Sequence, residues 1–486
     1  MALPDLIEIV PLQKPVRAEI TVPGSKSITN RALILAALAD GEVTLEGALW
    51  SEDTQVMTEA LGKLGFEIKV EPDPNEFCNR RITVRGLGGK IPNAGTPEKP
   101  LELFVGNAGT AARFLAAMVC LGDGVYRLSG VPRMHERPQA ALFKALRELG
   151  YRVDSENDKL PVLIFGRADL PVGPDASQRV PTKRTCTVSI KESSQFASAL
   201  LLSAKHGGWQ IKVAGEDSEE APYVTMTERM VAEFPWGDGQ FQVEPDASSG
   251  SYFIAANWLV SVASWMAGFL ERTPYSRIEG RFNEVWEWVN KSYLSGQVGP
   301  VTGDQLAVSV RNWPTSSWQI DADFPSFIPL PQQLSREDQL GDSIMTAVVL
   351  AADVWGGLGM ERREKGIKFT DLQRLRMQEC ERVTALRTEL KKCGAHVVEA
   401  GESLTVFQAT LHGAEIETYN DHRMAMCFAI LGLKVPGIKL KNPACVKKTF
   451  PNFFQKLAAP PPGGLGADIR DGRTGRKLAM DELFAD

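Results

Sequence analysis

One short pattern occurs three times, and it constrains the fold more than any other feature of this sequence. A helical run ends near a glycine and leads directly into a strand-like run at Glu59–Ile68, Lys144–Val153 and Thr388–Val397. Glycine suits the left-handed position that ends a helix and turns the chain into a strand. A single copy would be a routine helix stop, but three copies indicate one helix–strand unit that is repeated in both halves of the chain.

Strand-like and helical patterns also alternate elsewhere. Ala18–Val22 and Val43–Gly47 read as strands, whereas Ser27–Ala39 and Thr54–Leu64 have the apolar spacing of helices. This alternation is typical of an α/β protein. A length of 486 residues predicts two or three domains.

Breaker residues suggest where the domains meet. Pro23–Gly24 and Glu244–Asp246 are the expected crossing points. They divide the chain into residues 1–22, residues 23–244 and residues 245–457. Residues 265–302 and 325–339 look like insertions, and the Pro/Gly-rich opening of residues 458–486 predicts a flexible tail.

Composition excludes several classes of protein. A net charge of −6 argues against a nucleic-acid binder that relies on overall basicity. The seven dispersed cysteines form no C-x-x-C pair, which favours reduced thiols in the cytoplasm over disulfides or a metal site. The N-terminus has no signal-peptide pattern, and Tyr252–Leu270 fits a buried core helix better than a membrane span.

Four segments of the first half place cations, hydroxyls or glycines where a strand or loop enters a helix. The open N–H groups and positive dipole end of a helix start attract anions. Any one segment is explained about equally well as a capped surface helix. Four together favour binding of multiply charged anions, and they are Pro23–Arg31, Leu103–Arg113, Pro132–Pro138 and Lys191–Gln195.

The second half adds groups suited to acid–base chemistry. Thr418–Met426 joins an acid, an imidazole and a guanidinium before an apolar helix, and Arg376–Arg382 is a charged helix start. Alone, His422 is more often a structural histidine than a catalyst, and a charged helix turn is usually a solvated face.

Taken in order, these motifs resemble EPSP synthases. The resemblance extends from about Ile7 to Lys456, and the motifs Gly106–Thr110 and Tyr419–Met426 are especially specific to that family. It implies two domains, each of three βαβαββ units about a pseudo-threefold axis, that close on the substrates. The chain would cross between them twice, so that residues 1–22 plus 245–457 form one domain and residues 23–244 form the other. It also implies transfer of the enolpyruvyl group of phosphoenolpyruvate to the 5-hydroxyl of shikimate 3-phosphate, with release of phosphate. No metal or organic cofactor is expected, and the chain is expected to be a cytoplasmic monomer without a nucleic-acid or membrane partner.

The resemblance also implies which side chains bind the two anionic substrates. Shikimate 3-phosphate would contact Lys26, Ser27, Arg31, Ser193, Ser194, Gln195 and Tyr223. Phosphoenolpyruvate would contact Lys26, Asn107, Gly109, Arg133, Arg382, Arg423 and Lys448, with Thr110 and Arg113 in the same glycine-rich motif as Asn107.

The implied chemistry needs an acid and a base that act on different partners. Asp342 would accept the proton of the 5-hydroxyl, and Glu379 would protonate the methylene carbon of phosphoenolpyruvate. His422 would assist Glu379, and Lys26 is counted among the catalytic groups because it faces phosphoenolpyruvate.

Three positions depart from the family pattern. Gln378 stands where the family usually has a lysine that contacts the shikimate moiety, which predicts weaker binding or a compensating cation such as Arg374 or Arg376. Glu220 stands where a phosphate-binding serine is more common. Phe114 replaces a proline, and we expect it to alter a loop that lines the phosphoenolpyruvate pocket.

Two other functions remain open on the sequence alone. A UDP-N-acetylglucosamine enolpyruvyl transferase should have a reactive cysteine in a glycine-rich loop, and neither Cys78 nor Cys120 has that setting. A catalytically impaired paralogue that binds the same anions is favoured by Gln378 and Glu220 but opposed by the acid–base groups.

Overall fold

The computed structural model describes residues 3–14, 16–167, 184–215, 221–262, 308–353 and 366–485. The chain divides into two compact units. Unit 1 comprises Met1–Val22, Ala247–Pro314 and Ile320–Asp486, and unit 2 comprises Pro23–Asp246 and Thr315–Gln319. The expected insertion at 265–302 and Glu220 lie outside the described residues.

Four sheets in the described part of the chain share one strand order. In each, a parallel pair of strands is extended by two antiparallel strands, as in β6-β7-β9-β8. Strands β6 to β9 follow one another as strand, helix, parallel strand, helix and hairpin, which is a βαβαββ unit. The same strand order occurs as β12-β3-β5-β4, β14-β15-β17-β16 and β18-β19-β1-β20. The α/β fold predicted from the sequence is therefore confirmed.

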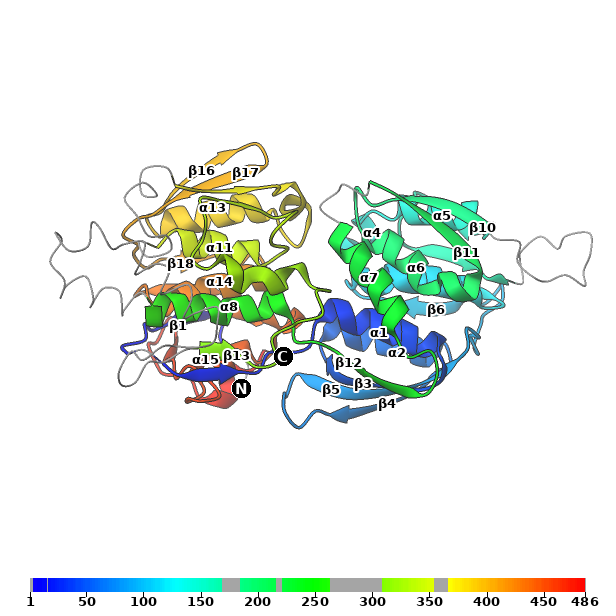
Figure 1. Ribbon diagram of the computed structural model, residues 1–486, viewed down its shortest axis with the longest axis horizontal. Helices are drawn as coiled ribbons and strands as arrows, with labels where there is room; N and C mark the ends of the chain where they lie inside the picture. Colours follow the sequence, from blue (N-terminus) through cyan, green and yellow to red (C-terminus); the bar gives the residue numbers. More distant parts are fainter. Residues whose placement is uncertain are drawn as a thin grey trace, which may run out of the picture. The chain divides into compact units, whose positions relative to one another are not determined.

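Unit 2 contains two of these sheets and the parallel pair β10-β11. Helices α1 and α2 lie along one side of the β12-β3-β5-β4 sheet (Figure 1). The strands are β3 (Asp40–Leu49), β4 (Glu67–Pro72), β5 (Asn79–Leu87), β6 (Leu101–Phe104), β7 (Val125–Ser129), β8 (Val153–Asp154), β9 (Val162–Phe165), β10 (Arg184–Ser189), β11 (Trp209–Ala214) and β12 (Gly239–Gln242). The helices are α1 (Lys26–Leu38), α2 (Glu52–Lys63), α3 (Gly109–Met118), α4 (Pro132–Glu136), α5 (Ala140–Glu148), α6 (Gln195–Gly207) and α7 (Ala221–Glu233).

Unit 1 contains the other two sheets and the parallel pair β13-β2. Its strands are β1 (Leu6–Ile9), β2 (Ala18–Ile20), β13 (Val308–Val310), β14 (Gln333–Ser335), β15 (Ile367–Thr370), β16 (His396–Ala400), β17 (Ser403–Phe407), β18 (Glu415–Ile416), β19 (Ile438–Lys441) and β20 (Ile469–Asp471). Its helices include α8 (Ala247–Asn257), α11 (Ile344–Ala351), α13 (Arg382–Lys392), α14 (His422–Gly432) and α15 (Phe453–Ala458), with a short 3₁₀ turn η6 (Gln373–Met377).

The repeated helix–glycine–strand pattern has the predicted backbone. Gly65, Gly150 and Gly394 have φ values of 96°, 91° and 89°. They follow α2, α5 and α13, and they lead into β4, β8 and β16. Each of these strands is the last in its sheet order. The repeat is therefore confirmed as one structural device that delivers the chain to a sheet edge in both units.

Each unit has its own apolar core. The buried helix α8 belongs to the core of unit 1, as expected for the apolar run that begins at Tyr252. Trp318 belongs to the core of unit 2, where its ring stacks on Phe241 with centroids 5.7 Å apart. This contact explains why Thr315–Gln319 groups with unit 2 although the flanking residues belong to unit 1. Among the described residues, no helix is long and apolar enough to cross a membrane.

The expectation of a flexible tail from residue 458 is wrong. Strand β20 pairs antiparallel with β1, and Leu478 and Leu483 are buried. Arg476 binds both carboxylate oxygens of Glu482 at 2.8 Å. The Pro/Gly-rich opening suggested a linker. However, the apolar residues beyond it are buried in the core of unit 1, and β20 pairs with the edge of β1 that β19 leaves open.

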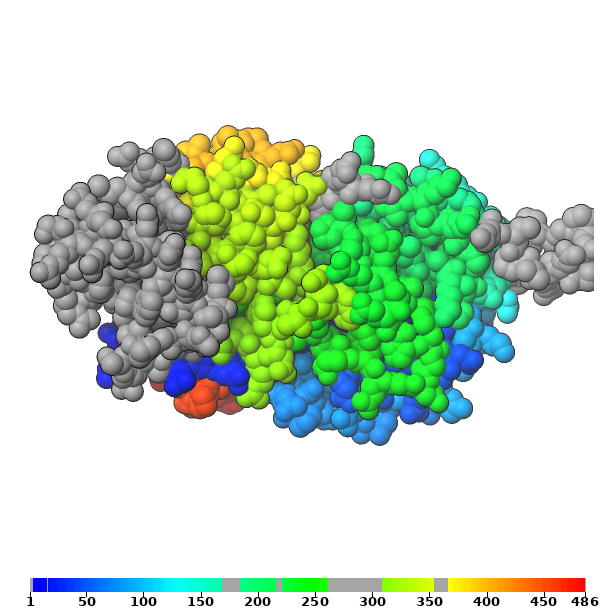
Figure 2. Space-filling model, viewed as in Figure 1, coloured from blue at the N-terminus to red at the C-terminus, as the bar shows by residue number. Residues whose placement is uncertain are grey.

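The segment expected to be an insertion at 325–339 is built into unit 1. It supplies β14, which pairs in parallel with β15, and Leu330 and Leu334 are fully buried. In the view of Figure 2, residues 308–353, coloured yellow-green, make up much of the coloured surface of unit 1. This segment therefore adds an ordered edge strand to a sheet of the fold.

Candidate active site

In unit 2, the start of α1 is organised around Arg31. The side chain is buried, and its Nε donates to Oγ1 of Thr227 at 2.7 Å. Its Nη2 donates to Oγ of Ser198 at 3.0 Å, and its Nη1 donates to the carbonyl oxygen of Ser27 at 2.9 Å. A longer contact of 3.4 Å joins Nη2 to the carbonyl oxygen of Tyr223. These partners hold the cation with hydroxyl and carbonyl oxygens.

The starts of α3 and α6 meet at a second buried arginine. Arg113 donates from Nη1 to Oε1 of Gln195 at 2.6 Å, and Nε2 of Gln195 donates to Oγ1 of Thr110 at 3.2 Å. A Cβ at Gly109 would lie 2.6 Å from Nη1 of Arg137 and 2.8 Å from Nη1 of Arg113. A side chain at this position would therefore displace the two guanidinium groups that pass over the helix start.

The starts of α1 and α3 have no side-chain cap, whereas at the start of α6 the N–H of Gln195 donates to Oγ of Ser193 at 3.3 Å. Ser25, Ala108 and Ser194 precede α1, α3 and α6, and none makes a side-chain hydrogen bond to its helix start. The first turn of a helix has N–H groups without intrahelical partners, and it carries the positive end of the helix dipole. Ser193 and Ser194 are buried at the start of α6. The three starts are thus chemically suited to bind phosphate or carboxylate oxygens.

Other side chains of unit 2 that were predicted to bind the substrates have ionic partners or lie at the surface. Lys26 pairs with Asp53 at 3.1 Å. Arg133 pairs with Glu136 at 2.5 Å, and its side chain is 63% exposed. Asn107 is exposed, and its carbonyl oxygen accepts from Arg137 at 3.3 Å. Asp53 was not singled out from the sequence, because an acidic residue at a helix start is not distinctive there. Arg137 belongs to the predicted anion-binding segment Pro132–Pro138 but was given no role in binding a substrate.

In unit 1, cationic and amide groups converge on the carboxylate of Asp342. Nη2 of Arg336 contacts Oδ1 at 3.2 Å, and Nε2 of Gln378 contacts the same oxygen at 3.4 Å. Nη2 of Arg423 lies 3.1 Å from Oδ2, and Nη1 of Arg382 lies 3.7 Å from it. Four residues that are 6 to 81 positions away in sequence therefore surround one carboxylate.

Arg382 joins Asp342 to the second predicted catalytic carboxylate. Its Nη2 donates to Oε2 of Glu379 at 2.8 Å, and its Nε donates to Oδ2 of the buried Asp421 at 2.7 Å. Its Nη1 also donates to Oε1 of Gln378. On its other oxygen, Glu379 accepts from Nζ of Lys448 at 2.8 Å. Asp342 and Glu379 are thus held on different sides of one guanidinium group.

Asp421 has a positioning role in this cluster. Its carboxylate caps α14 by accepting from the backbone N–H of Arg423 at 2.9 Å, and it also binds Arg382. The ring of His422 is buried, with Nδ1 3.8 Å from Oδ1 of Asp421. The motif was recognised from the sequence, but the role of Asp421 was not. An aspartate before a helix is expected to cap it, and the sequence does not show that the same carboxylate also binds Arg382.

The surroundings of Asp342 control its acidity. Burial alone would raise its pKa, but Arg423, Arg382 and Arg336 outweigh burial and hold the pKa well below its usual range. Burial would lower the pKa of Arg382, but Asp421, Glu379 and Asp342 raise it above its usual value. The cluster therefore holds Asp342 as a carboxylate and Arg382 as a guanidinium.

Two expectations about family departures need correction. Arg376, one candidate for a compensating cation near Gln378, instead binds Glu381 at 2.8 Å and Glu399 at 2.7 Å. Phe114 does not lie in a loop. It is buried inside α3 beneath the guanidinium of Arg31, at 5.3 Å from the ring centroid, because its apolar ring completes the core-facing side of that helix.

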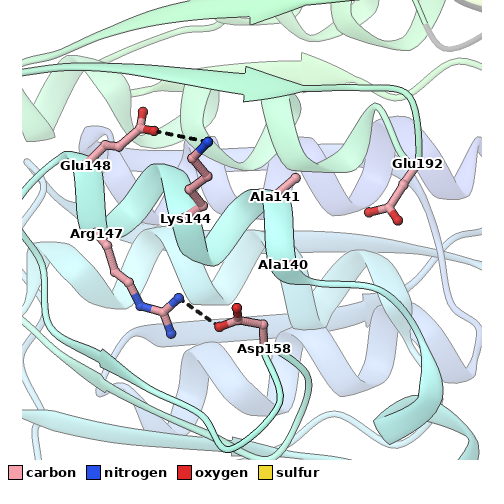
Figure 3. Close-up of a pocket in the computed structure, with 7 residues that line it drawn as sticks. All are labelled: Ala140, Ala141, Lys144, Arg147, Glu148, Asp158 and Glu192. Atoms are coloured by element: carbon pink, nitrogen blue, oxygen red, sulfur yellow. Dashed lines mark hydrogen bonds and ion pairs between the residues drawn. The ribbon is translucent and has the colours of Figure 1, made fainter.

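A hollow elsewhere in unit 2 has a different character (Figure 3). Its lining cations face carboxylates, with Lys144 3.9 Å from Glu148 and Arg147 2.7 Å from Asp158. The seven residues that line it include none of the predicted site residues. Because its charges are already paired and solvated, we do not count it as part of the candidate site.

The cysteines provide no candidate nucleophile. All seven lie among the described residues as free thiols, and six are buried. Burial raises the pKa of the Cys120 thiol far above its usual value. A thiol held in its neutral form is a poor nucleophile.

Comparison with known proteins gives a consistent result. A family model described as EPSP synthase (3-phosphoshikimate 1-carboxyvinyltransferase) matches residues 10–237 and 340–457. The 3-phosphoshikimate 1-carboxyvinyltransferase of Nostoc punctiforme is 34% identical over 478 residues, which cover 93% of this chain and 98% of the relative. The protein of the same name from Opitutus terrae is 33% identical over 489 residues, which cover 94% and 98%.

Solved structures agree at the level of the fold. An EPSP synthase structure from Acinetobacter baumannii aligns with a TM-score of 0.61 at 20% identity, covering 96% of this chain and all of the other. The enolpyruvyl transferase NikO from Streptomyces tendae aligns with a TM-score of 0.56 at 16% identity, covering 97% and 99%.

Proposed function

Because this chain belongs to the EPSP synthase family of 3-phosphoshikimate 1-carboxyvinyltransferases, we propose a specific division of labour between its two clusters of side chains. The enzyme transfers the enolpyruvyl group of phosphoenolpyruvate in the shikimate pathway. The cluster of unit 2 binds the phosphate of shikimate 3-phosphate. The cluster of unit 1 binds phosphoenolpyruvate and carries the acid and the base.

Asp342 is the base in this proposal, and its arginine contacts are the observation that carries it. A base must be ionised before the hydroxyl arrives, and the arginines keep Asp342 in that form. The same contacts make it a weak base. When the anionic groups of phosphoenolpyruvate engage Arg382 and Arg423, Asp342 loses part of that positive surrounding and its pKa rises. Substrate binding thereby makes the carboxylate basic enough to take the proton of the 5-hydroxyl.

Glu379 is the acid in this proposal. Glu379 accepts hydrogen bonds from Arg382 and Lys448, which compete with a proton for its oxygens. Phosphoenolpyruvate draws those two cations toward its own charges and leaves Glu379 able to carry a proton. Attack of the 5-hydroxyl oxygen on C2 and transfer of that proton to C3 give a tetrahedral adduct. Phosphate then leaves with the proton that Asp342 took from the 5-hydroxyl, and C3 returns one proton to Glu379. The enol ether forms, and both carboxyl groups regain their starting states.

Binding in unit 2 uses a different device. The start of α1 offers N–H donors without a side-chain cap, Ser193 and Ser194 offer hydroxyls at the start of α6, and Arg31 adds a positive charge that donates to hydroxyl and carbonyl oxygens. Charge-assisted hydrogen bonds of this type contribute about 1.5–3 kcal/mol each. Several of them offset the mutual repulsion of two multiply anionic substrates.

The acid–base cluster also bears on the two competing functions. A reactive thiol is required for the reading as a UDP-N-acetylglucosamine enolpyruvyl transferase, and Cys120 is buried with a raised pKa. An impaired paralogue has no need to keep Asp342 and Glu379 in separate ionic contacts about one arginine. Both points favour the active transferase.

Phosphate release tests the proposal directly. The full chain is incubated with phosphoenolpyruvate and shikimate 3-phosphate, and free phosphate is measured with either substrate omitted as a control. We expect release only when both are present, and a decrease of about 10²–10⁴-fold for Asp342→Asn. Asp353→Asn is the matched control, because Asp353 pairs with Lys434 at 2.7 Å outside the cluster. No release by the parent protein, or full activity of Asp342→Asn, would overturn the proposal.

A further inference from the structure

Arg336 is a buried cation in unit 1 that the acid–base scheme above does not use. It follows β14 in a tight turn that ends at Leu340. The N–H of Ser335 donates to Oε1 of Gln339 at 2.8 Å, and the N–H of Leu340 donates back to the carbonyl oxygen of Ser335 at 3.2 Å. The N–H of Arg336 itself donates to the carbonyl oxygen of Thr370 at 3.2 Å. The backbone of Arg336 is thus fixed before any substrate binds.

The side chain of Arg336 meets one oxygen of the proposed base. It contacts Oδ1 of Asp342, which also receives the amide of Gln378, while Arg423 and Arg382 lie at Oδ2. Only 2% of the Arg336 side chain is exposed, whereas Asp342 is 14% exposed. The two oxygens of Asp342 therefore have different partners, and Arg336 is a cation on the side away from Arg423.

Substrate binding affects these contacts unequally. Arg382 and Arg423 are proposed to engage phosphoenolpyruvate, so their hold on Asp342 weakens during the reaction. Arg336 belongs to a hydrogen-bonded turn, and its buried side chain has little freedom to follow a substrate. It remains with Asp342 when the other arginines turn to the ligand.

We propose that Arg336 is a positioning residue that orients the Asp342 carboxylate through Oδ1 and supplies its permanent positive partner during turnover. This inference rests on the proposed role of Asp342 as the base. It gives the segment 325–339, which looked like an insertion, a function in the reaction. That segment lies between the two ranges that match the family model.

Charge rescue from a second backbone position tests this role. Gln378 reaches the same oxygen as Arg336, so a lysine at position 378 can restore a cation there. We expect Arg336→Gln to lower kcat at least tenfold, with KM for phosphoenolpyruvate changed less than threefold. In Arg336→Gln/Gln378→Lys, we expect at least fivefold recovery of kcat. A solely structural arginine would lower the melting temperature, and its loss would not be repaired from position 378.

The pH profile provides a second readout. The charged groups that face Asp342 are Arg336, Arg382, Arg423 and Glu379, and removal of one cation raises the pKa of the carboxyl group. The acid limb of kcat should therefore move to higher pH in Arg336→Gln and move back in the double variant. Arg387→Gln is the matched control, because Arg387 pairs with Glu399 at 3.0 Å outside this cluster.

Each outcome decides a different question. A double variant no more active than Arg336→Gln, or an acid limb that stays in place in the folded single variant, overturns the inference. If Arg336→Gln fails to fold, Arg336→Lys keeps the charge, and a loss of kcat above tenfold in that folded variant overturns it. Inactivity of the parent protein, or full activity of Asp342→Asn, instead overturns the proposed function.

Discussion

Arg31 and Arg113 of unit 2 differ from Arg382 and Lys448 of unit 1 in the groups to which they donate, although Lys26 and Arg133 of unit 2 also pair with carboxylates. In unit 2, Arg31 and Arg113 donate to hydroxyl, carbonyl and amide oxygens, and α1 and α3 start without side-chain caps. In unit 1, Arg382 and Lys448 are bound to carboxylates, and α13 and α14 are capped by Glu381 and Asp421.

This difference separates binding from chemistry. A hydroxyl or carbonyl oxygen carries no full negative charge, so exchanging such a contact for an arriving anion costs a cation less than exchanging a carboxylate. A cation paired with a carboxylate must exchange one anion for another, so the net gain on binding is smaller. In the proposed scheme, unit 1 supplies the carboxylates for proton transfer, and unit 2 binds the phosphate of shikimate 3-phosphate.

Of the changes that test this difference between the two clusters, substitution of Glu379 should have the largest effect on kcat. Glu379→Gln removes the proposed acid, so kcat should fall about 10²–10⁴-fold. The same change leaves Lys448 and Arg382 more available, so KM for phosphoenolpyruvate should fall. Steady-state kinetics measure both. Glu399→Gln is the control, because Glu399 also pairs with two arginines. An increase in KM for phosphoenolpyruvate would contradict the exchange of ion partners.

Replacement of Arg31 by an uncharged residue should weaken the binding of shikimate 3-phosphate rather than slow the chemical step. Loss of charge-assisted hydrogen bonds worth about 1.5–3 kcal/mol raises KM for shikimate 3-phosphate about 10–150-fold. The value of kcat should change little, because Arg31 contacts no proposed acid or base among its described partners. Arg229→Gln, on the exposed side of α7, is the control. A decrease confined to kcat would show that unit 2 takes part in the chemistry.

Hydrogen exchange measured with one substrate at a time should distinguish the two clusters further. At equal concentrations, shikimate 3-phosphate alone should slow hydrogen exchange in the first turns of α1 and α6. Phosphoenolpyruvate alone should protect the first turn of α14 less, because its cations are already paired and Asp421 already caps the helix. Equal protection by the two ligands would mean that ionic pairing in unit 1 does not oppose binding.

Low pH should destabilise the C-terminal segment of unit 1, residues 458–485. This should be the smallest of the four predicted effects. Hydrogen bonds from Arg476 and from the backbone N–H of Ala479 hold the pKa of Glu482 at about 2. A lowered pKa gives stability that is present above the ordinary value of about 4.3 and is lost as the pH falls toward 2. We therefore expect proteases to cut residues 458–485 more readily near pH 3, with Glu482→Gln showing the same sensitivity at pH 7. An unchanged cleavage rate in Glu482→Gln would show that apolar burial alone holds the segment.

Local patterns were enough to find the repeat and the family motifs. Gly65, Gly150 and Gly394 were recognisable because a left-handed residue after a helix is a local backbone requirement. Membership of the family was likewise readable from short runs such as Tyr419–Met426. The roles of the individual site residues stay predictions, although the clusters around Asp342 and Arg31 are consistent with them.

Tertiary structure alone decided which charges meet. The sequence does not indicate that Arg336 and Gln378 share one oxygen of Asp342, because that contact depends on how β14 and β15 pair. It also suggested a loose tail where β1 offers an edge for β20. Helix ends and strand alternation depend on neighbouring residues, whereas ion pairs and edge pairing depend on distances that exist only after distant segments have folded together.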